Sequence, residues 1–547
     1  MKVAEAVGRA LAASGIGQVF GVVGSGNFHV TNAMVAAGAR FVATRHEGGA
    51  ATMADAYART SGTVAALSVH QGCGLTNALT GIGEAAKSRT PLVVIAPEAT
   101  QRHSNFHVDQ EALGRAVGAR SARVTSAADA VAQTTAAVRV AAQERCTVVL
   151  NLPLDVQAQE VPDAERALAA VAPPPPRTPV EPADVDVAAL AEILAHAQRP
   201  VFIAGRGARG APGRAALEEL AERCGALLAT SAVARGLFHG NPWSLDVAGG
   251  FATPLAAELI AEADVIVGWG CALTMWTTRH GRLIGAETTV VQVDDDPAAL
   301  GAHRPVHLGV TGDVALVARR VLAAAEDRVG HRTATAAFAL AARPGWRDVP
   351  YVDGGTRDRI DPRTLSIALD EILPPQRVIG VDSGNFMGYP TMYLSVPDEQ
   401  GLCFTQGFQS IGLGLATAIG AALALPDRLP VAAVGDGGLM MSAVELDTVR
   451  RLGLPMVVIV YNDDAYGAEV HHFGPDGHPL DTVEFPPASI AAIARGYGFE
   501  AVTVRTVEDL KAVRDWVAGP RTSPLLIDAK VLRDQAAWWL EEAFRGH

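Results

Sequence analysis

Short apolar runs alternate with amphipathic stretches along almost the whole chain. Runs of three to six apolar, mostly β-branched residues predict buried strands at residues 19–23, 64–69, 92–95, 147–152, 201–203, 265–267, 289–293, 431–434 and 456–461. Buried strands separated by helices are typical of parallel sheets that are covered on both faces. The pattern therefore predicts an α/β protein made of doubly wound parallel sheets.

Two stretches interrupt this alternation. Four consecutive prolines at 173–176 cannot lie inside a helix and predict a stiff linker, and residues 343–362 are irregular and rich in proline and glycine. The remaining pieces, 1–170, 180–340 and 355–547, each have the size of one doubly wound domain. Three domains are therefore expected.

Composition narrows the class of partner and the compartment. The chain of 547 residues carries 45 Lys and Arg against 58 Asp and Glu, a formal net charge of −13. This surplus of acid argues against nucleic acid or an anionic membrane as the main partner. The five cysteines are scattered, the N-terminus is amphipathic, and no apolar run approaches the roughly 20 residues of a membrane helix. A soluble cytoplasmic protein is expected.

The most obvious glycine motif lies in the middle piece. GRGARG at 205–210 follows a predicted strand and matches the dinucleotide fingerprint GxGxxG. Pro212 stands where the phosphate-binding helix would begin, and the next strand ends in Thr230 and Ser231 instead of an acidic ribose ligand. A turn that packs strand against helix is favoured over an NAD site, and an NAD oxidoreductase is kept as a rival hypothesis.

Carboxylates follow two predicted strands of the C-terminal piece. Residues 435–438 read GDGG, with Asp436 at the strand end, and Asp463 follows the run 456–461. Oxygen ligands and glycine amides suit Mg²⁺ with a diphosphate, because the metal takes carboxylates and the amides take phosphate. In the alternative, Asp436 only caps a helix and Asn462 and Asp463 only form a turn. These residues alone leave both interpretations open.

A wider resemblance favours the first interpretation. GDGG followed by YNDDAYGAE, with Asp463 27 positions after Asp436, resembles the cofactor motif of thiamine-diphosphate-dependent enzymes. The resemblance implies metal ligation by Asp436, by Asp463 and by the carbonyl of Ala465. Asp463 stands where the family usually has Asn, which adds a negative charge. The resemblance also implies cofactor contacts at Gly435, Gly437, Gly438 and Tyr466.

Motifs elsewhere extend this resemblance over the whole chain. RHE at 45–47, with the small-residue stretch that follows, is similar to acetolactate-synthase-like enzymes and implies that Glu47 contacts the aminopyrimidine ring. In QSIGLG at 409–414, Ile411 corresponds to the apolar residue that holds the cofactor bent, and the Gln409 carbonyl would accept from its 4′-amine. The loop DSGN at 382–385 matches the family's diphosphate loop, with Ser383 and Asn385 as candidate contacts.

The resemblance implies a reaction but leaves its outcome open. Family members decarboxylate a 2-oxo acid to an enamine, which is either protonated or added to a second carbonyl compound. Ser25 and His70 resemble residues of benzoylformate-type decarboxylases, and Glu469 aligns with a glutamate of pyruvate-decarboxylase-like relatives. His471 is a further candidate for proton transfer. An arginine that acetolactate synthases use has no counterpart in CALTMW at 271–276.

The combined expectation is a thiamine-diphosphate- and Mg²⁺-dependent carboligase or decarboxylase acting on a small 2-oxo acid. FAD, present in some synthases, is a doubtful cofactor because its middle-domain contacts are not recognisable. Since relatives build one site from two subunits, a homodimer or homotetramer with active sites at the interface is implied. A non-catalytic binding protein that keeps the fold is the remaining alternative.

Overall fold

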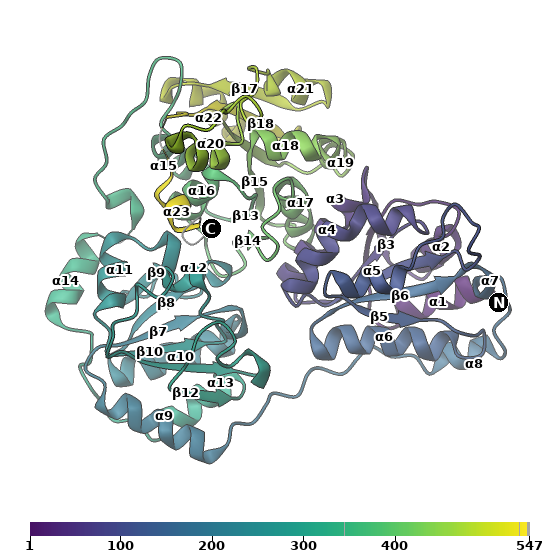
Figure 1. The fold of residues 1–547 in the computed structure, drawn as a ribbon, viewed down its shortest axis with the longest axis horizontal. Coiled ribbons are helices and arrows are strands. Elements are labelled where there is room, and N and C mark those ends of the chain that lie inside the picture. The colour runs from purple at the N-terminus through teal and green to yellow at the C-terminus, as the bar shows by residue number, and fades with distance from the viewer. Residues whose placement is uncertain (344, 535, 544–547) are drawn as a thin grey trace.

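The computed structural model describes residues 1–343, 345–534 and 536–543, so the predicted piece 355–547 is described in part. The strands form three six-stranded sheets in which all neighbouring strands run parallel. Figure 1 shows the sheets as three lobes with helices packed around each. The predicted α/β class is thereby confirmed. No helix in the described ranges is long and apolar enough to cross a bilayer.

The N-terminal unit comprises the first sheet and its helices. Its strand order is β2-β1-β3-β4-β6-β5. The strands are β1 (Gln18–Gly21), β2 (Arg40–Ala43), β3 (Ala65–Ser68), β4 (Leu92–Glu98), β5 (Arg120–Arg123) and β6 (Thr147–Pro153). The helices are α1 (Val3–Ala13), α2 (Phe28–Ala36), α3 (Glu47–Ser61), α4 (Cys73–Lys87), α5 (Gln110–Ala116), α6 (Ala130–Glu144), α7 (Leu154–Gln157) and α8 (Ala164–Ala169). The central strands are buried on both faces, which explains their nearly unbroken apolar sequences.

The middle unit follows an extended proline-rich connection, residues 171–183, that runs between the two lobes (Figure 1). Its sheet has the order β12-β11-β10-β7-β8-β9. The strands are β7 (Pro200–Ala204), β8 (Leu227–Thr230), β9 (Ser244–Val247), β10 (Val265–Trp269), β11 (Thr289–Asp294) and β12 (Leu308–Thr311). The helices are α9 (Asp184–His196), α10 (Ala211–Cys224), α11 (Pro254–Ala261), α12 (Met275–Thr278), α13 (Val314–Leu322) and α14 (Ala334–Ala342).

The GxGxxG loop of this unit packs backbone against backbone. The Gly205 N–H donates to the Trp269 carbonyl over 2.8 Å, and the Gly207 N–H donates to the Gly270 carbonyl over 3.0 Å. A Cβ atom at Gly205 would lie 2.3 Å from the Gly270 oxygen, so a side chain is excluded there. The glycines thus bring the loops after β7 and β10 together, and Pro212 lies in the first turn of α10.

The C-terminal unit contains the third sheet, in the order β14-β13-β15-β16-β18-β17. The strands are β13 (Arg377–Val381), β14 (Leu402–Phe404), β15 (Leu429–Gly435), β16 (Val457–Asn462), β17 (Glu500–Val504) and β18 (Leu525–Lys530). The helices are α15 (Pro362–Ile372), α16 (Gly388–Tyr393), α17 (Gly414–Ala424), α18 (Asp436–Ser442), α19 (Leu446–Arg451), α20 (Gly467–Phe473), α21 (Ile490–Gly496), α22 (Lys511–Ala518) and α23 (Trp538–Ala543).

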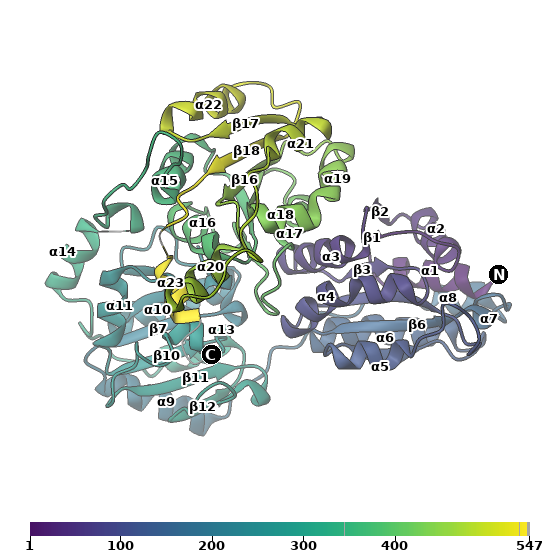
Figure 2. The same ribbon diagram turned by 45° about the horizontal axis from the view of Figure 1, so that its top comes forward.

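The N-terminal and C-terminal units pack through α3 and α17, which lie side by side in both views (Figures 1 and 2). The contact is close because α17 is built from small residues: a Cβ atom at Gly420 would lie 2.2 Å from the Met53 carbonyl oxygen. Next to it, the buried Glu84 carboxylate pairs with Arg59 and accepts the Gly407 N–H over 3.0 Å. Apolar packing and a satisfied charge together join the two units.

Candidate active site

A cavity of about 240 Å³, called the C-terminal cavity below, opens at the carboxyl ends of strands in the third sheet. Ligands of open α/β sheets typically bind at such ends. Among the residues that line it are those predicted from the sequence: Ser383, Asn385, Gln409, Ile411, Gly435, Asp436, Gly437, Gly438, Asp463, Ala465, Tyr466 and Glu469. His471 is half-buried on α20 and is not among the lining residues. Residues from four separate loops of the unit therefore meet in one place.

Two carboxylates lie at adjacent strand ends in this cavity. Gly435 of β15 pairs with Tyr461 of β16, so Asp436 and Asp463 follow at the same edge of the sheet. Both carboxyls are 9% exposed, and burial raises the pKa of each. The neighbouring Asp436 charge adds to this increase at Asp463. Two buried neighbouring carboxylates with raised pKa values are a ready site for a divalent cation.

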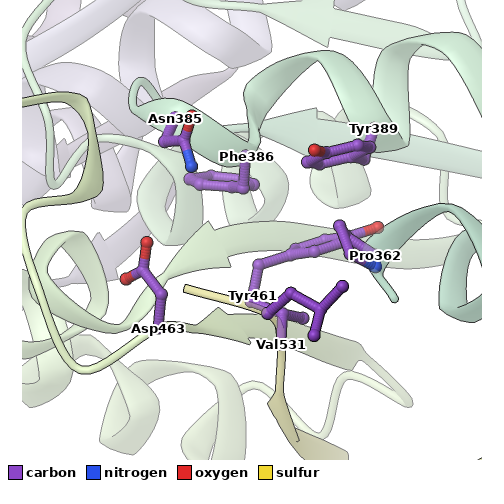
Figure 3. Close-up of a pocket in the computed structure, with 8 residues that line it drawn as sticks. Pro362, Asn385, Phe386, Tyr389, Tyr461, Asp463 and Val531 are labelled. Atoms are coloured by element: carbon purple, nitrogen blue, oxygen red, sulfur yellow. The ribbon is translucent and has the colours of Figure 1, made fainter. Parts of the chain in front are cut away.

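Asp463 also borders a small cavity of about 10 Å³, which shares Asn385, Phe386 and Tyr461 with the C-terminal cavity (Figure 3). Figure 3 shows its carboxylate pointing toward Asn385. The rings of Phe386 and Tyr461, which line the same cavity, are stacked with their centroids 5.2 Å apart and 19° between their planes. This space is large enough for about one water molecule. Asp463 thus lines both cavities.

Glycines after β15 leave the backbone accessible. A Cβ atom at Gly437 would lie 2.5 Å from Tyr466 Cε1, and one at Gly438 would lie 2.4 Å from Asp382 Oδ2. Side chains are excluded at both positions, while the first N–H groups of a helix are free to bind an anion. This cradle and the two carboxylates fit a diphosphate with a divalent metal, because both groups need oxygen and amide partners.

Asp382 fixes the turn that carries Gln409 and Ile411. Its carboxylate accepts N–H groups from Ser383 (2.9 Å), Gly412 (3.0 Å) and Leu413 (3.2 Å). Burial raises the pKa of Asp382 to about 6, although these hydrogen bonds favour the ionised form. Gln409 has φ 58°, a left-handed conformation that a residue with a side chain rarely adopts. The strained turn presents Ile411 to the cavity.

The second group of predicted residues gathers in the N-terminal unit. Glu47, buried at the start of α3, accepts from Asn77 Nδ2 over 3.0 Å. A Cβ atom at Gly74 would lie 3.1 Å from His70 Cβ and 3.4 Å from Glu47 Oε1, so Gly74 lies between these side chains. The loop with the exposed Ser25 reaches the same place, since a Cβ atom at Gly24 would lie 2.4 Å from His70 Nδ1. We call Glu47, Asn77, Gly74, His70, Ser25 and Gly24 the Glu47 group.

His70 has an unused hydrogen-bonding atom in this group. Its Nδ1 is buried and has no hydrogen-bond partner, and its ring meets Phe106 edge-on at 5.2 Å. A buried polar atom without a partner is uncommon in a native protein and indicates a missing ligand or water. The Glu47 group therefore combines a carboxylate with a buried imidazole nitrogen that has no hydrogen-bond partner among the described residues.

The Glu47 group and the C-terminal cavity are separate in one chain. All described residues that line the cavity lie at position 275 or later. No described residue of the N-terminal unit therefore contributes to it. The two units do touch nearby, because Glu445 Oε1 accepts the N–H groups of Arg45 and His46, each over 3.0 Å. The predicted site residues of one chain thus form two separate groups.

Sequence reasoning missed part of the cavity wall. Met275 and Trp276 come from α12 of the middle unit, Leu540 comes from α23, and Gln406 precedes the Ile411 turn. The polar loop after β14 could have indicated Gln406. The resemblance points to the segment 271–276 only through its missing arginine, and no local pattern marks Leu540, because these residues reach the site through the packing of units and of the C-terminal helix.

Comparison with known proteins decides the family. Three models of thiamine pyrophosphate enzymes match the chain: the N-terminal TPP binding domain at residues 1–117, the central domain at 187–321 and the C-terminal TPP binding domain at 382–529. A probable 2-ketoarginine decarboxylase of Pseudomonas aeruginosa is 31% identical, over 94% of this chain and 91% of that protein. The chain belongs to the thiamine pyrophosphate enzymes.

Other relatives of this thiamine pyrophosphate enzyme carry different activities in their names. A sulfoacetaldehyde acetyltransferase of Rhodobacter capsulatus is 29% identical over 100% of this chain and 96% of its own length. An acetolactate synthase large subunit of Parasynechococcus marenigrum is 27% identical over 97% and 88%. The similarity spans whole chains, so the common cofactor, thiamine pyrophosphate (thiamine diphosphate), is shared while the named reactions differ.

Proposed function

We propose that this protein is a Mg²⁺-dependent thiamine diphosphate enzyme that acts on a 2-oxo acid and joins the decarboxylated fragment to a second carbonyl compound. The observation that carries the proposal is the pair of half-sites: buried carboxylates and glycines in the C-terminal cavity, and Glu47 with His70 in the N-terminal unit. When bound, thiamine diphosphate supplies the stabilisation of the carbanion formed on decarboxylation. The chain supplies binding, orientation and proton transfer.

The C-terminal cavity would hold the metal and the diphosphate. Asp436, Asp463 and the carbonyl of Ala465 would be the metal ligands, since Mg²⁺ prefers oxygen. The amides of Gly437 and Gly438 would bind phosphate oxygens, with Gly435, Ser383, Asn385 and Tyr466 lining the same region. Ile411 would support the bend of the cofactor, and the Gln409 carbonyl would accept from its amine.

The Glu47 group would perform the proton transfers. Glu47 would share a proton with a ring nitrogen of the pyrimidine, and its hydrogen bond from Asn77 holds the carboxylate in place. His70 and Ser25 would receive the substrate carboxylate and return a proton to the product. Glu469 lines the C-terminal cavity and would exchange a proton with the substrate, whereas His471, which is not among the lining residues, would act only through a neighbour.

A second copy of the chain would bring the half-sites together. Beside the glycine cradle, Met440, Met441 and Val444 are 50%, 54% and 44% exposed, and such a cluster of apolar side chains favours coverage by another surface. We propose a homodimer or homotetramer in which the Glu47 group of one copy closes the C-terminal cavity of the other. We also propose that each chain has three domains, at residues 1–170, 180–340 and 355–547.

Replacing Glu47 by Gln tests the mechanism. We expect Glu47→Gln to lower kcat by at least roughly 100-fold, because general acid–base catalysis contributes about that much. The affinity for thiamine diphosphate, measured by calorimetry with Mg²⁺ present, should change little. Glu111→Gln, an exposed residue of the same unit, is the matched control. Full activity of Glu47→Gln would contradict the mechanism and favour a binding protein.

Mixing two inactive variants tests the shared site. Glu47→Gln and Asp436→Asn each damage one half-site, so random mixing of subunits would restore about a quarter of the wild-type sites if each site uses two copies. If both half-sites come from one chain, mixing restores nothing. The sedimentation coefficient of the mixture reports the oligomeric state independently of activity.

A simple decarboxylase is the second candidate. It is favoured by Trp276, which lines the cavity in the segment where acetolactate synthases carry an arginine for the acceptor. Incubation with pyruvate and with benzoylformate separates the two activities, because acetolactate indicates ligation and benzaldehyde indicates decarboxylation. Titration with NADH, followed by fluorescence, tests the oxidoreductase hypothesis; the closely packed glycine loop predicts no binding.

A further inference from the structure

The outer wall of the C-terminal cavity is apolar. It is formed by Met275 and Trp276 of α12, by Ala468 of α20 and by Leu540 of α23. Helix α23 is held in place by Trp539, whose Nε1 donates to the Asn385 carbonyl over 3.1 Å and whose ring packs against Gly388. The wall is therefore a fixed surface made by three segments of the chain.

The charge of the cavity has one sign. Among the described residues that line it there is no Lys, Arg or His, while Asp436, Asp463 and Glu469 are acidic. Asp436 and Asp463 would be neutralised by the metal, but Glu469 lies outside that pair. The described lining thus offers no cation to a second anionic group on a substrate.

An arginine does lie near this wall, but its charge is used elsewhere. Arg279 follows α12 directly, and it donates from Nε to the Gly249 carbonyl over 2.9 Å and from Nη2 to the Ala252 carbonyl over 3.0 Å. Its guanidinium lies 4.7 Å from the centre of the Trp538 ring. These contacts direct Arg279 into the fold and not into the cavity.

Resting on the proposed function, we infer that the substituent of the 2-oxo acid is an uncharged hydrocarbon group that binds against Met275, Trp276 and Leu540. An anionic substituent would lose its hydration in this cavity without gaining a partner, and Glu469 would repel it. The α-carboxylate of the substrate is a separate group, which the Glu47 group would receive. The wall therefore selects against an anionic group at the far end of the substrate.

The experiment compares three acids on the cofactor-loaded enzyme: 4-methyl-2-oxopentanoate, 2-oxoglutarate and 5-guanidino-2-oxopentanoate. We expect kcat/KM for the first to exceed that for 2-oxoglutarate by at least roughly 100-fold, because an unpaired buried charge is costly. An equal or higher value for either charged acid overturns the inference. If none of the three is turned over although calorimetry shows bound cofactor, the proposed function itself fails.

Variants of Trp276 give a second measurement. Trp276→Arg introduces a cation into the wall. The ratio of kcat/KM for 4-methyl-2-oxopentanoate to that for 2-oxoglutarate should therefore fall by at least roughly 10-fold, whereas Trp276→Phe should preserve the wild-type order. Calorimetry with thiamine diphosphate and Mg²⁺ shows whether each variant still forms its site. If Trp276→Arg binds cofactor and leaves the ratio unchanged, Trp276 does not contact the substituent and the inference is overturned.

Discussion

The N-terminal and C-terminal units have the same strand order and different chemistry. Counted from the first strand of each unit, both sheets run 2-1-3-4-6-5, and α3 and α17 each follow the second strand. After the third strand, the N-terminal unit has His70 and the C-terminal unit has Asp436. The comparison teaches that the scaffold fixes where loops meet, while the loop residues determine what is bound.

The loops after the first strand show the same contrast in their internal support. In the N-terminal unit the buried amide of Asn27 accepts the Gly24 N–H over 2.8 Å and donates to Ser68 Oγ over 2.9 Å. In the C-terminal unit the carboxylate of Asp382 accepts the N–H groups of a neighbouring turn. One loop is held by a neutral group and the other by a group that can ionise.

The largest expected effect separates Asp436 from His70, which occupy equivalent positions. Asp436→Asn should weaken binding of thiamine diphosphate with Mg²⁺ by roughly 1000-fold, about 4 kcal/mol, because a buried anionic ligand is lost. His70→Ala should change this affinity by no more than about threefold and lower kcat instead. Calorimetry and steady-state kinetics measure the two quantities. An equal loss of cofactor affinity in both variants would show that cofactor binding and proton transfer are not assigned to different units.

The next prediction concerns the contact between the two equivalent helices. In Gly420→Ala the new methyl group would lie 2.2 Å from the Met53 carbonyl oxygen and 2.9 Å from Ala56 Cβ. Because a backbone oxygen cannot move away, we expect a loss of stability of about 3 kcal/mol. Gly496→Ala is the control, since nothing lies within 4 Å of its Cβ position in α21. Thermal unfolding should show a lower Tm for the first variant and an unchanged or higher Tm for the second.

Much of the fold could be predicted because most buried strands carry their own signal. Every predicted run coincides with a strand, from β1 to β16. The six edge strands were not predicted from apolar runs, and β5 shows why: Arg120–Arg123 has one neighbouring strand and is partly exposed, so its sequence is polar. The repeat of the strand order in two units is invisible in the sequence, because topology constrains connections more than residue types.

The candidate site also contains residues that could be predicted from the sequence and residues that could not. Glycines, carboxylates and the Ile411 turn could be found because each lies in a short loop after a strand, where spacing along the chain reflects spacing in the fold. The apolar wall could not, since Trp276 and Leu540 are 264 positions apart and meet only through packing. The use of Asp382 as the support of the Ile411 turn also depends on a contact between separate loops.

The smallest effect tests the contrast between Asn27 and Asp382. The folded-state pKa of Asp382 is about 6, above the ordinary value of 3.8. Between these two pH values the folded protein keeps a proton on Asp382 that the unfolded chain has already released. Wild-type stability therefore falls as pH rises from about 4 to 6 and is then unaffected by this group. From pH 4.5 to 7 the change amounts to about 2 kcal/mol. Because Asp382→Asn lacks this dependence, its Tm should rise relative to the wild type over that range. Asn27, the corresponding support in the N-terminal unit, is neutral. If the difference in Tm between Asp382→Asn and the wild type stays constant over this pH range, the ionisation of Asp382 does not distinguish the two loops.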